Sequence, residues 1–227
     1  MDSEILTYHF IKMTQDNASK LLDRQKNHNA VICFDLEDSF NDFSHQYKIN
    51  AQKEKQRELI INLLSFNENN FEGLKIGIRI NSPGTKEFLK DLTFLNEINC
   101  YTEIESIFIP KIETPGEIES TYNKFINKGV YYKDIIPIIE TVKGMKSLKE
   151  IAALPDNVFN KLAFGHCDFN LDQENFPFHH QFSEIYWQWI NNILEITEPA
   201  QKTFINSPYL FLNDDLTFNK MLNNYNL

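Results

Sequence analysis

Two acidic residues, Glu140 and Asp168, each follow an apolar run of the kind that forms a buried strand. In α/β barrels the catalytic groups lie at the edge where the strands end. Magnesium sites commonly use one or two carboxylates, with water and substrate oxygens completing the shell. We therefore predict that Glu140 and Asp168 hold Mg²⁺. The alternative is that each acid caps the following helix or pairs with a nearby lysine.

Arg79 lies in a run, residues 75–81, in which every second residue is isoleucine. Because side chains alternate faces along a strand, Gly77, Arg79 and Asn81 are expected on the other face. We expect Gly77 in a crowded interior, with Arg79 and Asn81 at its mouth. A buried arginine requires an anion, and its planar fork suits a carboxylate or an enolate oxygen. The alternative is a structural ion pair with Asp35 or Glu37.

Asp35, Glu37 and Asp38 follow one another closely at the end of another strand-like run. Three acids are too many to remain unpaired in a buried place. We expect some of them to face Arg79, a lysine (Lys12 or Lys111) or a hydrated metal ion. The alternative is that Asp38 simply begins the next loop.

Two further side chains are candidates for the same site. Lys111 ends a strand-like run and brings positive charge for substrate binding, and a desolvated lysine could also form a Schiff base. The alternative for Lys111 is a salt bridge with Glu113 or with the acids of the second strand. His166 shares a face with Asp168 along the expected strand over residues 161–169, which makes it a candidate for substrate binding, and a structural histidine is the alternative.

Strand-like and helix-like runs alternate along the chain, which favours a parallel α/β sheet with right-handed crossovers. The polar end of the 75–81 run favours a TIM-type barrel, and the absence of nucleotide-binding loop motifs weakens the open-sheet alternatives. We predict one domain over residues 1–227. The expected strands cover residues 8–13, 30–37, 75–81, 106–111, 135–141, 161–169 and 202–207. The expected helices cover residues 17–26, 52–66, 85–96, 116–128, 147–154 and 182–196.

Composition narrows the function class. The formal net charge is −10, which argues against nucleic-acid binding, since an acidic chain repels phosphate backbones. The three cysteines form neither a zinc pattern nor a disulfide framework, which favours a reducing compartment. No apolar run reaches the roughly 20 residues that span a membrane, and no signal peptide is evident. We expect a cytoplasmic protein that binds neither nucleic acid nor membranes.

Taken together, these segments resemble the citrate lyase beta-chain and malyl-CoA lyase superfamily, a branch of the pyruvate/phosphoenolpyruvate TIM barrels. Five motifs occur in the order of that family and span roughly residues 8–210. They are residues 34–39, 79–81, 109–114, 139–144 and 164–169.

The resemblance implies a magnesium-dependent carbon–carbon lyase. The acids that match Glu140 and Asp168 bind Mg²⁺, which chelates a 2-oxo acid such as oxaloacetate, pyruvate or glyoxylate. The arginine that matches Arg79 stabilises the enolate. The barrels of this superfamily usually associate, so a homo-oligomer is expected.

The resemblance also gives roles to the neighbouring residues. Backbone amides of the segment from Gly165 through His166 to Asp168 hold the substrate carboxylate. The acids that match Glu37 and Asp38 hydrogen-bond water on the metal.

Two features refine the resemblance. Asp38 and Ile138 stand where the free-aldehyde aldolase branch has His and Gln, so the chain looks closer to the branch that acts on CoA esters. A CoA or acyl-carrier thioester is therefore a candidate substrate. The family's last strand and C-terminal lid have no match, which leaves the general base unassigned. Hence the second interpretation is a catalytically degenerate barrel that acts as a binding or assembly subunit.

Overall fold

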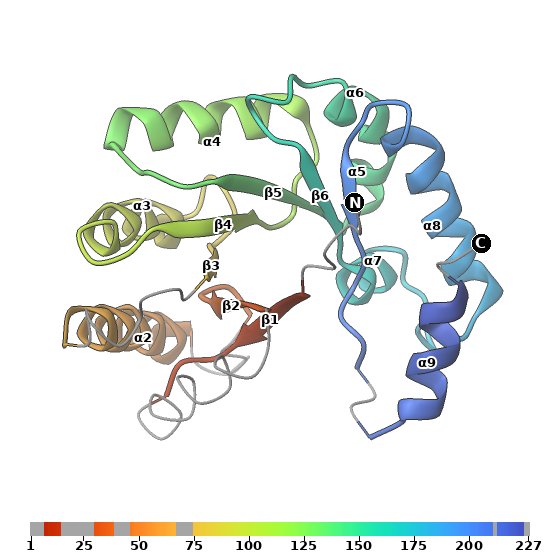
Figure 1. The fold of residues 1–227 in the computed structure, drawn as a ribbon, viewed down its shortest axis with the longest axis horizontal. Helices are drawn as coiled ribbons and strands as arrows, with labels where there is room; N and C mark the ends of the chain where they lie inside the picture. Colours follow the sequence, from red (N-terminus) through yellow and green to blue (C-terminus); the bar gives the residue numbers. More distant parts are fainter. Residues whose placement is uncertain (1–6, 15–29, 39–45, 67–74, 211–212, 225–227) are drawn as a thin grey trace. The chain divides into compact units, whose positions relative to one another are not determined.

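The computed structural model describes residues 7–14, 30–38, 46–66, 75–210 and 213–224 (Figure 1). Strands and helices alternate, and the strands of the sheet follow chain order from β1 to β7. The strands are β1 (Thr7–Ile11), β2 (Ala30–Asp35), β3 (Ile76–Arg79), β4 (Ile104–Ile109), β5 (Asp134–Ile139), β6 (Lys161–Phe164) and β7 (Thr203–Ile205). The helices are α2 (Gln46–Phe66), α3 (Lys86–Ile98), α4 (Pro115–Lys128), α5 (Val142–Lys146), α6 (Leu148–Ala152), α7 (His166–Asp172), α8 (Glu184–Thr197) and α9 (Asp215–Asn224).

Parallel pairing in chain order with intervening helices is the arrangement of a TIM-type barrel over seven strands, which confirms the predicted fold class. The chain divides into two compact units. Unit 1 comprises residues 1–110 and 119–136, and unit 2 comprises residues 111–118 and 137–227. The single domain remains a prediction. No helix within the described ranges has the length and hydrophobicity to span a membrane.

In unit 1, the register of β2 and β3 explains the glycine at position 77. Cys33 pairs with Gly77, and Asp35 pairs with Arg79. A Cβ added at Gly77 would lie 2.6 Å from Cys33 Sγ and 3.2 Å from Val31 Cγ1, which is too close for a side chain. The crowded interior predicted at Gly77 is therefore confirmed.

The isoleucines of β3 lie on the opposite face of the strand from Gly77 and are fully buried. Helices α2 and α3 bring apolar side chains to unit 1, among them the buried Ile60, Leu64, Phe88, Leu92 and Leu95. Thr85 caps α3, since its hydroxyl accepts the amide hydrogen of Phe88 at 3.1 Å.

In unit 2, aromatic side chains form the core between β6, α7 and α8. Phe164 and Phe169 make an edge-to-face contact with ring centroids 5.3 Å apart, and Trp189 lies 5.0 Å from Phe169. Tyr186 is completely buried. Tyr186, Phe164 and Phe169 are thus part of the core of unit 2.

Two sequence-based boundaries differ from the structure by more than two residues. The helix expected over residues 52–66 begins at Gln46, and the end of one strand is also wrong. The strand expected over residues 161–169 ends at Phe164, and α7 begins at His166. The helix expected over residues 147–154 is the second of two short helices, α5 and α6. Helix α9 was not predicted, and the helix expected over residues 17–26 lies outside the described residues.

Candidate active site

Glu140 follows the last residue of β5 and is only 3% exposed. Its Oε1 accepts the backbone amide of Lys111 at 2.9 Å. The next residue, Thr141, caps α5 through a 3.0 Å hydrogen bond from the Gly144 amide to its hydroxyl. The end of a buried strand and the cap of a helix therefore fix the Glu140 backbone from both sides.

Gly165 faces Glu140 on the neighbouring strand end. Ile138 pairs with Ala163 and Ile139 with Phe164, so the register places Gly165 next to Glu140. A Cβ at Gly165 would overlap Glu140 Oε2 and would lie 2.8 Å from Glu140 Cβ. The Glu140 side chain can lie this close to the backbone only because residue 165 has no side chain.

Asp168 lies in the first turn of α7, and its side chain is 27% exposed. Lys111 Nζ lies 3.2 Å from Asp168 Oδ2. Lys111 has a backbone φ of 55°, a left-handed conformation that is uncommon for a residue other than glycine. Lys111 therefore contacts both predicted metal ligands, Glu140 with its amide and Asp168 with its ammonium group.

The junction that carries Asp168 is held by a residue from a distant part of the sequence. Ser207 Oγ donates to the Phe164 carbonyl at 2.6 Å and accepts the His166 amide at 3.1 Å. The Gly165 amide donates to the Ile139 carbonyl at 3.0 Å. These bonds set the angle at which α7 leaves β6 and thus the place of Asp168.

Glu140 and Asp168 fit the requirements of a magnesium ion in number and type, because two carboxylates suffice for Mg²⁺. The observation that supports the fit is the donor set itself, since both carboxylates lie in unit 2 and Lys111 contacts each of them. Across the described ranges, no three His, Cys, Asp or Glu side chains gather as a metal cage. The ammonium group of Lys111 lies at the Asp168 carboxylate. This is the alternative from the sequence, in which the acid pairs with a nearby lysine. This pair is part-exposed, so an arriving dication would have to displace the ammonium or share the carboxylate with it.

In unit 1, Arg79 is held by the last residue of β2, Asp35, and by two acids that follow it. Asp35 binds it with both oxygens, to Nε and Nη2 at 2.7 Å each. Arg79 Nη1 lies 3.3 Å from Glu37 Oε2 and 3.5 Å from Asp38 Oδ2. The guanidinium also lies over the ring of Phe10, 5.6 Å from its centroid. We call Asp35, Glu37, Asp38 and Arg79 the arginine cluster.

The arginine cluster confirms that these acids face Arg79, and it includes the ion pair with Asp35 and Glu37 that was the structural alternative. Burial would lower the pKa of Arg79, but the hydrogen bonds and charge of Asp35, followed by Glu37 and Asp38, raise that pKa above its ordinary value. Arg79 is thus permanently charged and rigidly oriented. Whether its role is catalytic remains a prediction.

The His166 side chain does not lie on the face shared with Asp168, as the sequence predicted. The alternation of faces no longer applies there, because the strand has ended and His166 is the first residue of α7. Its Nε2 lies 3.0 Å from His180 Nδ1, and its ring packs edge-to-face on Tyr186. Burial, together with His180, lowers the pKa of His166 to about 4, so the ring is neutral at pH 7. This is the structural histidine of the alternative interpretation, and the His166 amide is already bonded to Ser207.

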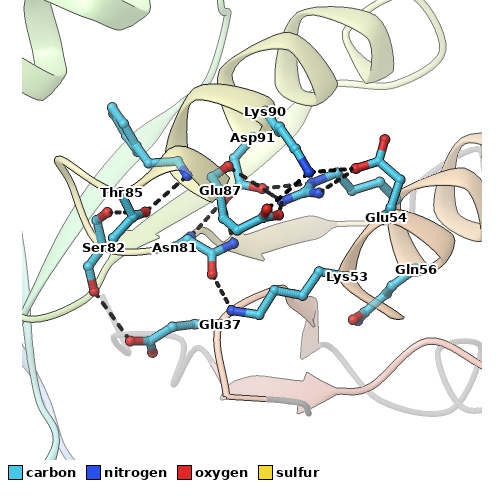
Figure 2. Close-up of polar contacts among 12 residues, drawn as sticks. Glu37, Lys53, Glu54, Gln56, Asn81, Ser82, Thr85, Glu87, Lys90 and Asp91 are labelled. Carbon is cyan, nitrogen blue, oxygen red and sulfur yellow. Dashed lines mark hydrogen bonds and ion pairs between the residues drawn. The ribbon is translucent and has the colours of Figure 1, made fainter. Parts of the chain in front are cut away.

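Two other expectations need correction. Asn81 was expected at the mouth of the interior face, but β3 ends at Arg79 and the alternation stops there. Asn81 instead contacts Lys53 of α2 and Asp91 of α3 (Figure 2). Glu113, an expected partner of Lys111, pairs with Lys143 at 2.7 Å.

Sequence reasoning missed a buried polar network in unit 1 (Figure 2). Lys53, Gln56 and Arg57 of α2 are buried, and Asp91 of α3 is 0% exposed. A signal was present, because Lys53, Gln56 and Arg57 occupy the helix positions that continue the buried stripe of Ile60 and Leu64. Charged residues in such a stripe indicate buried partners.

Comparisons with known proteins agree with the fold. No protein-family model matches the sequence, and no curated protein sequence matches it. Among solved structures, RipC from Yersinia pestis has a TM-score of 0.65 at 21% identity, over 93% of this chain and 79% of RipC. CitE from Mycobacterium tuberculosis, in complex with magnesium and acetoacetate, has a TM-score of 0.65 at 18% identity, over 92% of this chain and 76% of CitE. A citrate lyase from Burkholderia xenovorans has a TM-score of 0.69 at 18% identity, over 92% of this chain and 66% of that protein. The predicted resemblance is confirmed at the level of the fold: this chain folds like citrate lyase-type α/β barrels.

Proposed function

We propose that the protein is a magnesium-dependent carbon–carbon lyase that breaks or forms an aldol-type bond to a 2-oxo acid. The observation that carries the proposal is the grouping of Glu140, Gly165 and Asp168 around Lys111 in unit 2. Further support comes from the similar folds of a citrate lyase and of CitE, which is in complex with magnesium and acetoacetate.

In this proposal Glu140 and Asp168 hold the ion, which supplies a Lewis acid for the oxygens of the 2-oxo acid. Oxaloacetate, pyruvate and glyoxylate are the candidate substrates. Lys111, which already contacts both acids, contributes positive charge for a substrate carboxylate.

Backbone amides complete the proposed substrate contacts. The His166 amide is bonded to Ser207 and the Gly165 amide to Ile139. The first-turn amides of a helix have no partner within that helix. We therefore assign the substrate carboxylate to the amides of Cys167 and Asp168 in the first turn of α7.

Arg79 has the electrostatic role. When the carbon–carbon bond breaks, its electron pair passes to the fragment that becomes the enolate, and the other fragment leaves as the carbonyl product. The enolate forms on the thioester, or on an oxo acid with an α-carbon such as pyruvate, and negative charge develops on its oxygen. A guanidinium held in one orientation stabilises such charge without reorganisation. Glu37 and Asp38 contact Arg79 directly, so we assign them the orientation of its guanidinium.

Three features of the biological setting are part of the proposal. A CoA or acyl-carrier thioester is the candidate second substrate, the protein acts in the cytoplasm, and it assembles as a homo-oligomer. Light scattering of the purified protein tests the assembly, and a monomer at all concentrations would contradict it.

Isothermal titration with Mg²⁺ tests the metal site. We expect Glu140→Gln and Asp168→Asn each to weaken Mg²⁺ binding by about tenfold or more, since each removes one of two charged ligands. Glu195→Gln on α8 is the matched control, because Glu195 is exposed and belongs to the same unit. Unchanged affinity in both site variants would refute the metal site.

A second measurement couples metal to substrate. At about 100 times the dissociation constant, a ligand of the folded state adds about 2.7 kcal/mol to the free energy of unfolding. Thermal unfolding with Mg²⁺ alone, pyruvate alone and both together should show the largest shift for the pair. Additive shifts would argue that metal and oxo acid bind independently.

The second candidate is a binding or assembly subunit without turnover. The specific observation in its favour is that both candidate cations already face acids, Lys111 at Asp168 in unit 2 and Arg79 at Asp35 in unit 1. Turnover separates the two functions. Joint binding of Mg²⁺ and oxaloacetate with no product after prolonged incubation, with or without a thioester, would establish the binding subunit.

A further inference from the structure

Lys53 is a buried lysine with a neutral partner. It lies on α2, is 9% exposed and donates through Nζ to Asn81 Oδ1 (Figure 2). Asn81 stands two residues after Arg79, the last residue of β3. A helix of unit 1 thus contacts the backbone segment that carries the arginine.

Asp91 binds the same asparagine from α3. Its Oδ2 accepts the Asn81 amide at 2.7 Å and Asn81 Nδ2 at 2.8 Å, while its Oδ1 accepts Arg57 Nε at 2.9 Å. Each of these partners is a donor, so the group acts as a carboxylate, because a protonated carboxyl would need an acceptor.

The orientation of the Asn81 side chain follows from its two neighbours. An ammonium group can only donate, and a carboxylate can only accept. Lys53 therefore selects the oxygen of the Asn81 amide, and Asp91 selects the nitrogen. The bond from the Asn81 backbone to Asp91 holds the main chain at the same time. Side chain and backbone are both fixed.

The fixed segment connects to the arginine cluster on both sides of Asn81. Ser82, the next residue, donates to Glu37 Oε1 at 3.4 Å. Arg79, two residues earlier, lies 3.3 Å from Glu37 Oε2. Burial lowers the pKa of Lys53, and Glu37 is the foremost of the charges that oppose this. Lys53 is therefore within electrostatic reach of Glu37.

Stability alone gives a poor reason for this arrangement. Burying an ammonium group costs several kcal/mol, and a well-packed aliphatic side chain is often as stable or more stable. A neutral amide oxygen returns less energy to a cation than a carboxylate does. Beyond an aliphatic residue, the lysine contributes a positive charge within reach of the neighbouring carboxylates, Glu37 foremost, and a single orientation of the Asn81 amide.

We infer that Lys53, Asn81 and Asp91 form a clamp that positions the Arg79–Glu37 pair. In this clamp Lys53 is a positioning residue. The inference rests on the proposed function for its consequence in catalysis, namely that the clamp orients the guanidinium that stabilises the enolate. The position of Arg79 does not depend on catalysis, and it can be measured separately.

The readout is the Arg79 Nε hydrogen, which is bonded to Asp35 Oδ1 and is therefore protected from exchange. It can be followed by NMR in arginine-labelled full-length protein, with the resonance assigned by its loss in Arg79→Lys. We expect Lys53→Met to accelerate exchange of this hydrogen by about tenfold, because Asn81 then loses one of the two side chains that hold it.

Lys90→Met is the matched control. Lys90 belongs to the same network, with ion pairs to Glu87 at 3.0 Å and Glu54 at 3.5 Å, but its side chain is 47% exposed and does not contact Asn81 in Figure 2. The control should leave the exchange rate of the Arg79 hydrogen unchanged. An equal acceleration in the control would show a general loosening of unit 1 and would overturn the inference.

Asn81→Ala is the second variant, since it removes the link between Lys53 and Asp91. Because both substitutions break one clamp, the double variant should accelerate exchange no more than either single variant. Additive effects, an unchanged Arg79 resonance in folded Lys53→Met, or failure of both single variants to fold would each overturn the inference and leave Lys53 a stabilising residue only.

Catalysis gives a separate result. If the wild-type protein turns over a 2-oxo acid, Lys53→Met should lower kcat, while KM changes by less than about twofold, as for an interaction made in the transition state. If the wild-type protein shows no turnover, the proposed function fails, and the exchange measurement still decides the clamp.

Discussion

Gly165 lies against the carboxylate of Glu140, so closely that any side chain at position 165 would overlap Glu140 Oε2. The contact follows from the β5–β6 register and places the backbone of one strand end beside the acid of the next. A substitution at Gly165 therefore displaces the Glu140 carboxylate while residue 140 remains a glutamate.

Gly165→Ala should displace the Glu140 carboxylate and weaken Mg²⁺ binding by about tenfold, while overpacking costs about 1–3 kcal/mol of the free energy of unfolding. Isothermal titration and urea unfolding measure the two effects. Gly116→Ala in α4 is the control, because a Cβ there meets no atom within 4 Å. Full Mg²⁺ affinity in Gly165→Ala would show that the ion does not use Glu140 in its present position.

Lys111→Met should strengthen Mg²⁺ binding. The ammonium group competes with a dication for Asp168, and its part-exposed ion pair corresponds to at most about 1 kcal/mol, so the gain should be about two- to fivefold. Lys143→Met, which removes the exposed pair with Glu113, is the matched control and should leave the affinity unchanged. Weaker Mg²⁺ binding in Lys111→Met would contradict competition at Asp168.

Arg79→Met should destabilise unit 1 strongly. It leaves Asp35 and Glu37 buried without their cation, and the removal of one partner from a buried pair costs about 3–5 kcal/mol. Urea unfolding measures the loss. Adding Asp35→Asn to Arg79→Met should recover part of the stability, because fewer uncompensated charges then remain. A double variant as unstable as the sum of the single variants would contradict this account of the cluster.

Stability should fall as the pH is lowered through the range set by His166. Its pKa is about 4 in the folded protein and 6.5 in an unstructured chain, so the unfolded state binds the proton more tightly. The stabilisation is fully present above pH 6.5 and lost progressively down to about pH 4, a change of the order of 3 kcal/mol. Urea unfolding at several pH values in this range measures the free energy of unfolding. That free energy should change less steeply with pH in His166→Gln than in the wild-type protein. Equal slopes would mean that His166 does not titrate as its surroundings require.

The parts of the fold that the sequence predicts are those with a strong local pattern. Alternating isoleucines predicted β3, and the crowding at Gly77 followed from the same alternation. The alternation of side chains between the two faces stops where a strand ends, and the sequence gives little indication of where that is. Asn81 and His166 lie just past the ends of β3 and β6, and both turn away from the predicted face.

The candidate site was predictable in its residue types and less so in its pairings. Arg79 with Asp35 follows from strand register, whereas Lys111 with Asp168 depends on the left-handed backbone of Lys111. The stripe of α2 indicates that Lys53 is buried, but its partners could not be predicted, because they come from α3 and the end of β3. Contacts between residues 28 apart in sequence, as for Lys53 and Asn81, leave no periodic pattern.

The hydroxyl group of Ser207 has a consequence for the order of events during synthesis. It joins Phe164 to His166, although it comes about forty residues later in the chain. Proteins are made from the amino end at roughly 5–20 residues per second, and early segments begin to fold during translation. Unit 1 can therefore assemble its arginine cluster on the ribosome while α7 still lacks the bond that sets its direction. Asp168 takes its final geometry only once the ribosome has passed Ser207, so one of the two proposed metal ligands is among the last residues to be put in order.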